Sequence, residues 1–276
     1  MATGVDLRSP VRAARQATRD GTGSAANRRP RVSTRRRALI RARIWLVALL
    51  APLAGCDRST SPAQRAHAAA AYPAVVASVE RDRAALAADL RAARTPADQA
   101  RVLDRASPAL ARLLADRILP AWNGTPWSIA GTAVGPGERP VACGYFVSTA
   151  LEHAGLRVER RLLAQQPAEH IVRSLVPAGR VARFRRVPLD QFLGAVLSGG
   201  DGVYLVGLDY HVGFLVVDRG RAYFHHASRR AGEVVREPAL LSSALASSSY
   251  RVVGKLSGRD LARAWLTGAA LPTWFN

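Results

Sequence analysis

Apolar residues recur at helical spacing between residues 140 and 155. Pro140 stands just before this pattern and Gly155 just after it, at positions where helices commonly begin and end. The apolar face consists of Phe146, Val147, Ala150, Leu151 and Ala154. The pattern therefore predicts a helix that carries Cys143 on its apolar face, in the first turn.

Short apolar runs and alternating patterns in the second half of the chain predict a sheet. Strands are expected over 181–187, 203–208, 211–217, 222–227 and 249–256. Short helices are expected within 161–177 and over 188–197, and a terminal helix over 259–266. The expected fold class is α+β, with the helix that bears Cys143 packed on an antiparallel sheet of about five strands.

The third and fourth of these strands are joined by a short polar turn that ends in Gly220, which suits the positive φ of a tight hairpin. A two-residue loop, or any other even-numbered one, places His226 opposite Gly213 and on the same sheet face as His211. An odd-numbered loop would place His225 there instead. The hairpin thus predicts two neighbouring imidazoles, with Gly213 leaving the space between them open.

The segment before this domain is predicted to be helical. Residues 72–120 contain two apolar-periodic helices, the second of which begins at Thr95-Pro96 with a capping-box pattern. They form a helical arm that packs on, or supports, the main domain. Residues 56–71 are rich in Ala, Ser and Gln and are expected to be a tether. A loop dense in Gly, Pro and Trp opens the main domain, residues 121–276.

Residues 1–55 lack the pattern of a folded domain. They are basic, and they end in the apolar run IWLVALLAPLAG, which is too short to span a bilayer comfortably but typical of a signal-peptide core. The run ends in Leu-Ala-Gly before Cys56, which resembles a bacterial lipobox, where the cysteine is acylated and becomes the mature N-terminus. The alternative is a short membrane anchor whose cysteine is accidental. We expect an exported lipoprotein, held in the bacterial cell envelope, at the periplasmic face of the inner or outer membrane, by lipid on Cys56.

The formal charge of +20 changes this interpretation little. Lys255 is the single lysine, and arginine and alanine are abundant throughout the chain, which indicates a compositional bias. The arginines are not interleaved with stacking aromatic residues, so no nucleic-acid partner is expected. If Cys56 is acylated, Cys143 is the one free thiol of the mature chain. Because exported proteins tend to pair or avoid cysteine, this favours a chemical role.

Cys143, His211 and one of the two adjacent histidines are the candidate chemical groups. The partial positive charge at a helix N-terminus favours thiolate, so the pKa of Cys143 is expected to be low and the residue to act as a nucleophile. The alternative is an inert thiol packed in the core. Two histidines at strand spacing also occur in metal sites, but no third ligand stands at ligand spacing, so neither a metal nor another cofactor is expected. The residues fit a nucleophile, a base and an orienting group.

Four segments occur in the order found in NlpC-like cell-wall peptidases of the papain-like cysteine hydrolase superfamily. They are GTPWSIAGT, CGYFVSTALEHAG, HVGFLVV and AYFHHAS, within residues 122–228. The resemblance implies a papain-like fold in which Cys143 is the nucleophile, His211 the base and His226 the orienting residue. Trp127 falls where the family usually has a tyrosine near the oxyanion site, and Gly144 and Tyr145 follow the nucleophile at the substrate and oxyanion side.

The chain departs from the family pattern beside the cysteine. The family commonly has Asp-Cys-Ser-Gly, whose Asp and Ser help to hold the amine of the peptide substrate, whereas this chain has Ala142-Cys143-Gly144-Tyr145. The cysteine and the histidines of the family pattern are present in this chain. The Asp and Ser that usually help to hold the substrate amine are absent. In place of the family's tyrosine, Trp127 offers an indole N–H donor but has no hydroxyl.

The resemblance and the leader together predict a membrane-anchored cysteine hydrolase. The substrate class it implies is an amide bond of a peptidoglycan stem peptide or another component of the cell envelope. Two alternatives use the same residues differently. One is an acyltransferase or lipid hydrolase on the same fold, and the other is a non-catalytic lipoprotein that binds cell wall or a partner through a degenerate cleft.

The lipobox predicts that wild-type protein carries lipid on Cys56. Cells fed an alkyne fatty acid should label the wild type and leave Cys56→Ala unlabelled and unprocessed, because only the thiol at the end of the apolar run can be acylated. Cys143→Ala is the matched control and should label like the wild type. Processed wild-type protein without label would contradict the lipoprotein interpretation.

Overall fold

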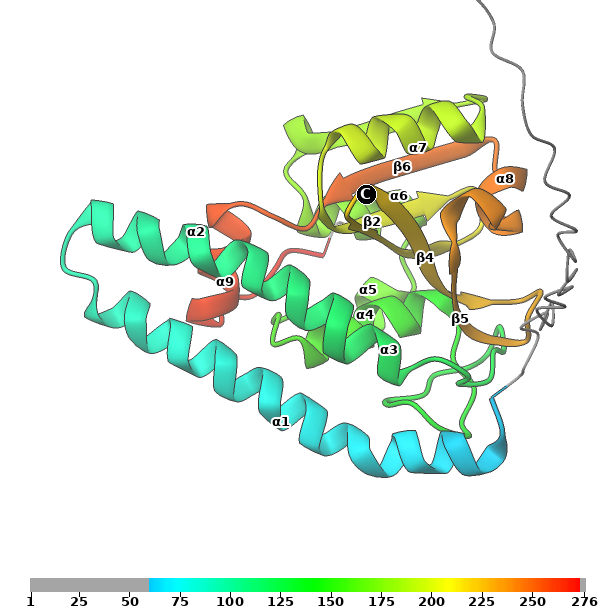
Figure 1. Ribbon diagram of the computed structural model, residues 1–276, viewed down its shortest axis with the longest axis horizontal. Coiled ribbons are helices and arrows are strands. Elements are labelled where there is room, and N and C mark those ends of the chain that lie inside the picture. Colours follow the sequence, from blue (N-terminus) through cyan, green and yellow to red (C-terminus); the bar gives the residue numbers. More distant parts are fainter. Residues whose placement is uncertain (1–59, 274–276) are drawn as a thin grey trace, which may run out of the picture. The chain divides into compact units, whose positions relative to one another are not determined.

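Six antiparallel strands form one sheet in the computed structural model, which describes residues 60–273 (Figure 1). The order across the sheet is β1-β6-β2-β3-β4-β5. The strands are β1 (Val181–Arg185), β2 (Gly202–Leu208), β3 (Val212–Asp218), β4 (Arg221–Ser228), β5 (Glu233–Pro238) and β6 (Tyr250–Lys255). The α+β class is confirmed, and β1 lies at an edge as its alternating basic residues predict. The expected count of about five strands lacked β5, whose sequence EVVREP has too few apolar residues to signal a strand.

The β3–β4 hairpin has the even-numbered loop that the turn sequence favours. Asp218 pairs with Arg221, and the two residues between them both have positive φ, 47° at Arg219 and 72° at Gly220. Phe214 therefore pairs with His225. This register places His225 and its neighbour on opposite faces of the sheet, as predicted.

Helices cover both faces of the sheet. They are α1 (Pro62–Ala92), α2 (Pro96–Leu113), a π-helical turn (Leu114–Ile118), α3 (Leu119–Ala121), α4 (Cys143–His153), α5 (Arg160–Ala164), α6 (Ala168–Leu175), α7 (Leu189–Ser198), α8 (Ser243–Ser247) and α9 (Arg259–Thr267), with single 3₁₀ turns at Ala178–Arg180 and Ala239–Leu241. The helix that begins at Cys143, and the helices predicted near 161–177, 188–197 and 259–266, are confirmed.

Much of the expected tether is helix. Residues 62–71 form the first turns of α1, so this part of the expected tether over 56–71 is helical. The physical reason is a capping box, in which the Ser61 hydroxyl accepts from the Gln64 backbone N–H and the Gln64 side chain accepts from the Ser61 N–H. It precedes an alanine run of high helix propensity. The predicted cap of the second arm helix, Thr95 with Asp98, is present.

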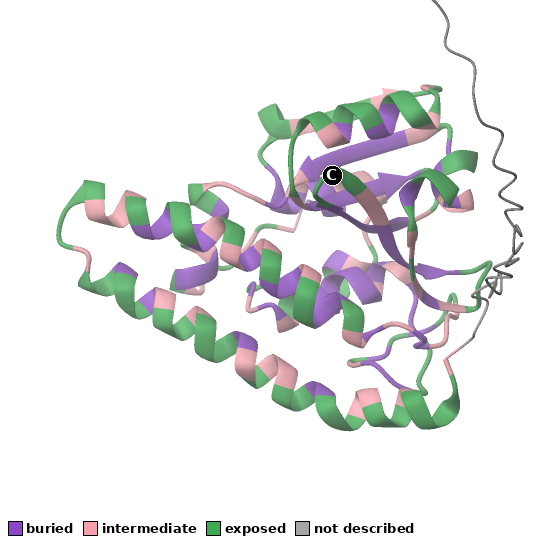
Figure 2. Ribbon diagram, viewed as in Figure 1, coloured by how far each residue is buried: buried purple, intermediate pink, exposed green. Residues whose placement is uncertain are grey.

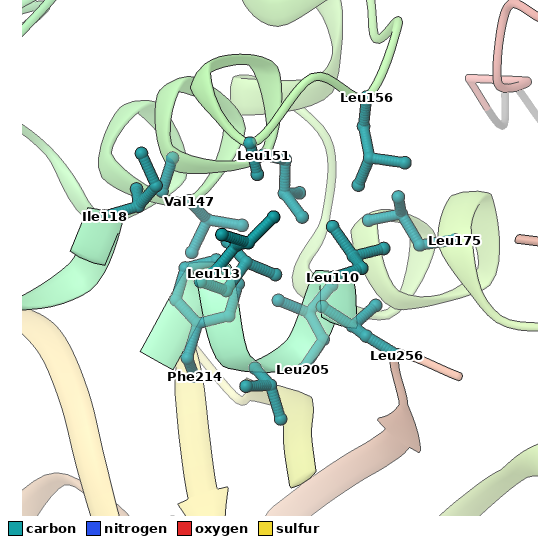
Figure 3. Close-up of a cluster of buried hydrophobic side chains, with 14 of the residues drawn as sticks. Leu110, Leu113, Ile118, Val147, Leu151, Leu156, Leu175, Leu205, Phe214 and Leu256 are labelled. Carbon is teal, nitrogen blue, oxygen red and sulfur yellow. The ribbon is translucent and has the colours of Figure 1, made fainter. Parts of the chain in front are cut away.

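One face of the sheet shares its core with the arm. Figure 3 shows leucines of α2, Leu110 and Leu113, converging with Val147 and Leu151 of α4 and with Phe214 of β3. All five side chains are buried, and α4 contacts the sheet through the edge-to-face pair of Phe146 with Phe214, whose centroids are 5.8 Å apart. The arm and the sheet domain therefore fold around common packing and are not independent.

The opposite face of the sheet packs on α7 and on the segment around α8. Phe192 and Val196 of α7 form a second cluster with Leu215, Val217 and Phe224 of the hairpin. Figure 2 shows the result, with the strands mostly buried and the outer surface of α1 exposed. The sheet is thus an inner layer between two helical layers, which explains why its central strands are apolar on both faces.

A buried polar network fastens the arm to α4. The Trp122 indole N–H donates to the Tyr72 hydroxyl at 3.0 Å, and the same hydroxyl lies 3.1 Å from His153 Nδ1. Burial raises the pKa of Tyr72 and lowers the pKa of His153, so both groups are neutral at pH 7. This network ties α1 to the last turn of the helix that begins with Cys143.

Within residues 60–273, none of the helices combines the length and apolar character required to span a membrane. The lipobox cysteine, Cys56, and the leader, residues 1–55, lie outside the described residues.

The shared core predicts that a cavity in the arm destabilises the whole domain. Leu110→Ala should lower the free energy of unfolding by about 2–5 kcal/mol, since Leu110 is 1% exposed and its loss leaves a void against α4 and the sheet. Leu240→Ala, at a side chain that is 62% exposed, is the control and should change it by less than about 0.5 kcal/mol. Urea unfolding followed by circular dichroism measures both. A separate early transition of the arm in Leu110→Ala would contradict the common core.

Candidate active site

Cys143 is the first residue of α4. The N-cap, Ala142, has extended backbone and supplies no side-chain cap, so the first N–H groups of the helix are free to meet other acceptors. The sulfur is half-buried, and the backbone N–H groups of Gly144, of Cys143 itself and of Val212 at the start of β3 lie close enough to act on its pKa. The thiol thus lies against the first residue of the strand that follows His211.

Burial dominates the acidity of this thiol. Burial raises the pKa of Cys143, and the three backbone N–H groups oppose this rise without overcoming it. The expectation of a lowered pKa is therefore wrong. The partial charge of a helix N-terminus is smaller than the cost of placing a thiolate in an apolar surrounding that contains no cation to pair with it.

His211 and His226 are directly hydrogen-bonded. Nε2 of His211 lies 2.8 Å from Nδ1 of His226, and the two ring planes meet at 80°. The predicted pairing of these two residues, in place of His225, is confirmed. One detail differs, because β3 begins at Val212 and His211 precedes the strand.

Glu237 extends this pair into a chain of three side chains. Its Oε1 lies 3.1 Å from Nε2 of His226. Burial alone would raise the pKa of Glu237, but hydrogen bonds from His226 and Ser242 outweigh it and hold the pKa below its ordinary value, so the carboxylate is charged at pH 7. Glu237 lies on β5, the strand that the sequence pattern did not reveal, and its place beside His226 depends on a register that no local pattern signals.

The charge of Glu237 constrains one proton of this group. An ionised Glu237 only accepts, so Nε2 of His226 carries the proton of their hydrogen bond. Burial, with a contribution from His226, lowers the pKa of His211 from 6.5 to about 3, so His211 is neutral at pH 7. In the tautomer where Nδ1 of His226 accepts from His211 Nε2, Nδ1 of His211 is an unprotonated base.

Phe224 fills the space that was expected to be open beside Gly213. A Cβ at Gly213 would lie 2.8 Å from two ring atoms of Phe224, so a larger residue would displace that ring. Phe224 stacks on His226 with centroids 4.4 Å apart and an interplanar angle of 23°. The glycine therefore admits an aromatic ring that holds the plane of the second imidazole.

Gly144 is required by a neighbouring carbonyl. A Cβ there would lie 2.1 Å from the backbone oxygen of Ala164, at the end of α5. No residue with a side chain fits, which explains physically why the position after the cysteine is not serine. Tyr145 is directed toward the same segment, where its hydroxyl accepts from Gln165 at 3.2 Å and its ring lies under the guanidinium of Arg160.

Trp127 lies on the loop that approaches the start of α4. It forms a bridge with Val141, two residues before the cysteine, and its backbone N–H donates to the Gly232 oxygen at 2.7 Å, next to β5. These contacts fasten the loop to the N-terminal side of α4 and to the strand that carries Glu237.

The two histidines line an open cleft of about 690 Å³. The other lining groups are mostly polar: Asp209, Tyr210, Arg229, Arg230, and the serines at 228, 243, 247 and 248, with Leu208 and Ala244. Cys143 is not part of this lining, and among residues 60–273 no hydrogen bond joins its sulfur to either imidazole. The fold thus brings His211 and His226 to the cleft, with Glu237 hydrogen-bonded to His226, and brings the thiol to the backbone N–H of Val212, the residue after His211.

No family model, curated protein or solved structure matches this chain. Among the described side chains, no group of three or more His, Cys, Asp or Glu residues has the arrangement to hold a metal ion.

Burial of neutral histidines predicts an acid-sensitive fold. The pKa values of His211 and His225 are both lowered by burial from 6.5 to about 3. Between these values the unfolded chain binds more protons than the folded one, so the free energy of unfolding should fall as pH falls from 6.5 toward 3. Each histidine contributes a slope of at most about 1.4 kcal/mol per pH unit.

Replacing one of these histidines should reduce that slope. In His225→Phe the loss of stability per pH unit between 6 and 4 should be shallower than in the wild type, measured by urea unfolding at each pH. His67→Phe, at an exposed position on α1, is the control and should keep the wild-type slope. Equal slopes in wild type and His225→Phe would contradict a neutral, buried His225.

Proposed function

We propose that this protein is a cysteine hydrolase of amide bonds with a papain-like arrangement of Cys143, His211 and His226. The observation that carries the proposal is the set of hydrogen bonds from Glu237 through His226 to His211, the residue before Val212, whose backbone N–H lies at the thiol. A helix that begins with the thiol and packs on an antiparallel sheet supports it further.

In the proposed reaction, Nδ1 of His211 removes the thiol proton as the Cys143 sulfur attacks the carbonyl carbon of the substrate. His211 returns this proton to the leaving amine when the C–N bond breaks, which leaves a thioester on Cys143. Water, deprotonated by His211, then hydrolyses the thioester and regenerates the thiol. Glu237 and His226 position His211 and stabilise it while it carries the proton.

The resting pair in this mechanism is a neutral thiol and a neutral imidazole. Burial raises the pKa of Cys143 and lowers that of His211, so both shifts disfavour a thiolate–imidazolium pair. The hydrogen bond from the thiol to Nδ1 forms when substrate is bound, as catalytic hydrogen bonds often shorten in the substrate complex. Backbone N–H groups at the start of α4, with the Trp127 indole, hold the oxyanion.

The proposed substrate is a peptidoglycan stem peptide in the cell envelope, reached by a protein anchored through Cys56. The order of the four family-like segments and the lipobox support this choice. Because Ala164 excludes a side chain at Gly144, recognition of the substrate amine falls to other groups than in the NlpC-like family.

A binding lipoprotein with a degenerate cleft is the second candidate. The observation that favours it is the thiol itself, whose pKa is raised by burial and lowered only by backbone N–H groups. The two candidates differ in whether Cys143 is needed for turnover.

Cys143 and His211 should act as one catalytic unit. With peptidoglycan digests as substrate and mass spectrometry of released fragments as readout, His211→Ala should lose roughly 10²–10⁴-fold in kcat/KM and Cys143→Ala should lose all turnover. The double variant should lose no more than Cys143→Ala. Wild-type kcat/KM should rise with pH above neutrality, since the pKa of the thiol is raised.

Glu237→Gln tests the positioning role, because glutamine keeps the size of the side chain but can donate to His226 and reverse the tautomers. It should lower kcat more than it changes KM. Glu233→Gln, on the same strand but outside this chain of hydrogen bonds, is the matched control. Fragment release that persists in Cys143→Ala would contradict Cys143 as the nucleophile. No release by the wild type from any wall or acyl substrate would leave the binding lipoprotein as the function.

A further inference from the structure

A second cavity lies on the other face of the sheet, away from the cleft with the histidine pair. Its volume is about 560 Å³, and it is lined by α2, by the ends of β2 and β3, and by parts of β4, β5 and β6. His225 lines it from β4 and Arg236 from β5, and these two residues are paired across the sheet. The cavity thus lies directly behind the strands that carry His226 and Glu237.

His225 is a buried polar group without a hydrogen-bond partner on Nδ1. It is 1% exposed, and no atom of residues 60–273 bonds to that nitrogen. Burial and the charge of Arg236 lower its pKa to about 3, so the ring is neutral at pH 7 and has one donor and one acceptor nitrogen. An unpaired buried nitrogen is costly, and such a group in a native fold calls for a ligand or a function.

Arg236 is held in a geometry suited to an oxyanion. The Cζ atom of its guanidinium lies over the Tyr223 ring, 3.4 Å from the centroid. Stacking occupies the face of the guanidinium and leaves its N–H groups in the plane, where they match the two oxygens of a carboxylate or phosphate. Within residues 60–273, neither Arg236 nor Arg112, which faces the cavity from α2, has an ion-pair partner.

The charged side chains that line the cavity leave a net positive charge at Arg112 and Arg236. Asp218 pairs with Arg219 at 3.6 Å, and Asp201 lies close enough to Lys255 to act on its charge. Lys255 also donates to the Gly199 oxygen at 2.8 Å. Once these pairs are set aside, Asp116, one helical turn after Arg112, is the carboxylate that remains in the lining with Arg112 and Arg236, so two cations accompany one carboxylate.

We propose that this cavity binds a small molecule that carries an oxyanion, a carboxylate or a phosphate group. Arg236 and Arg112 bind the oxyanion, and the ring of His225 contacts the same ligand. The site is distinct from the cleft of His211 and His226, and its occupancy does not depend on the chemistry proposed for Cys143.

The test uses the full chain in detergent and NMR of the histidine side chains labelled with ¹⁵N. Titration with inorganic phosphate in one arm, and with succinate in the other, at constant ionic strength should shift the ring resonances of His225 along a saturable curve in at least one arm. The arm that saturates at lower concentration identifies the oxyanion. Chloride at the same ionic strength should produce no saturable shift.

Arg236→Gln and Arg112→Gln should each raise the dissociation constant by at least tenfold, because each removes a charge-assisted contact. The matched control is Arg101→Gln, an exposed arginine of α2 outside the cavity, which should bind as the wild type does. Circular dichroism checks that each variant is folded, and the two arginines lie on different elements, so misfolding of one leaves the other to decide. Linear shifts in both arms, or unchanged binding in both variants, would overturn the proposal.

Discussion

The register between β3 and β4 is the constraint on which both faces of the sheet depend. It is set by the two-residue turn at Arg219 and Gly220, whose positive φ values match the twist of a hairpin. Side chains alternate along a strand, so a slip of one residue would exchange the positions of His225 and His226. His225 would then lie beside His211, and His226 would take the position behind the sheet.

Burial decides the protonation of the groups that this register brings together. His211 and His225 are both neutral at pH 7, because burial lowers the pKa of each imidazole and the neighbouring His226 and Arg236 lower it further. Glu237 remains charged, since it accepts hydrogen bonds from His226 and Ser242. The charged carboxylate of Glu237 and the neutral imidazole of His211 thus lie at the two ends of the hydrogen-bonded group in the cleft.

Close packing limits which side chains fit around the helix that begins with Cys143. The Ala164 carbonyl excludes a side chain at Gly144, and the ring of Phe224 occupies the place beside Gly213. The last turn of the same helix is fastened to the arm through His153 and Tyr72. The N-terminal arm therefore helps to hold α4 in place, and a cavity in the arm should disturb the candidate active site.

Local patterns determined much of this protein. The helix from Cys143, the cap at Thr95 and the parity of the hairpin all follow from neighbours in sequence, because caps, helical periodicity and tight turns involve only a few consecutive residues. The pairing of His211 with His226 follows from that parity, which fixes the face of each side chain.

Only the tertiary structure decided the rest. Glu237 lies on a strand with little apolar signal, and its contact with His226 joins two strands through a register that no local pattern contains. The raised pKa of Cys143 depends on how much of the folded chain covers the sulfur, and the clash at Gly144 depends on where α5 ends. These effects depend on groups that are distant in sequence and close in space, so the periodicity of the sequence does not predict them.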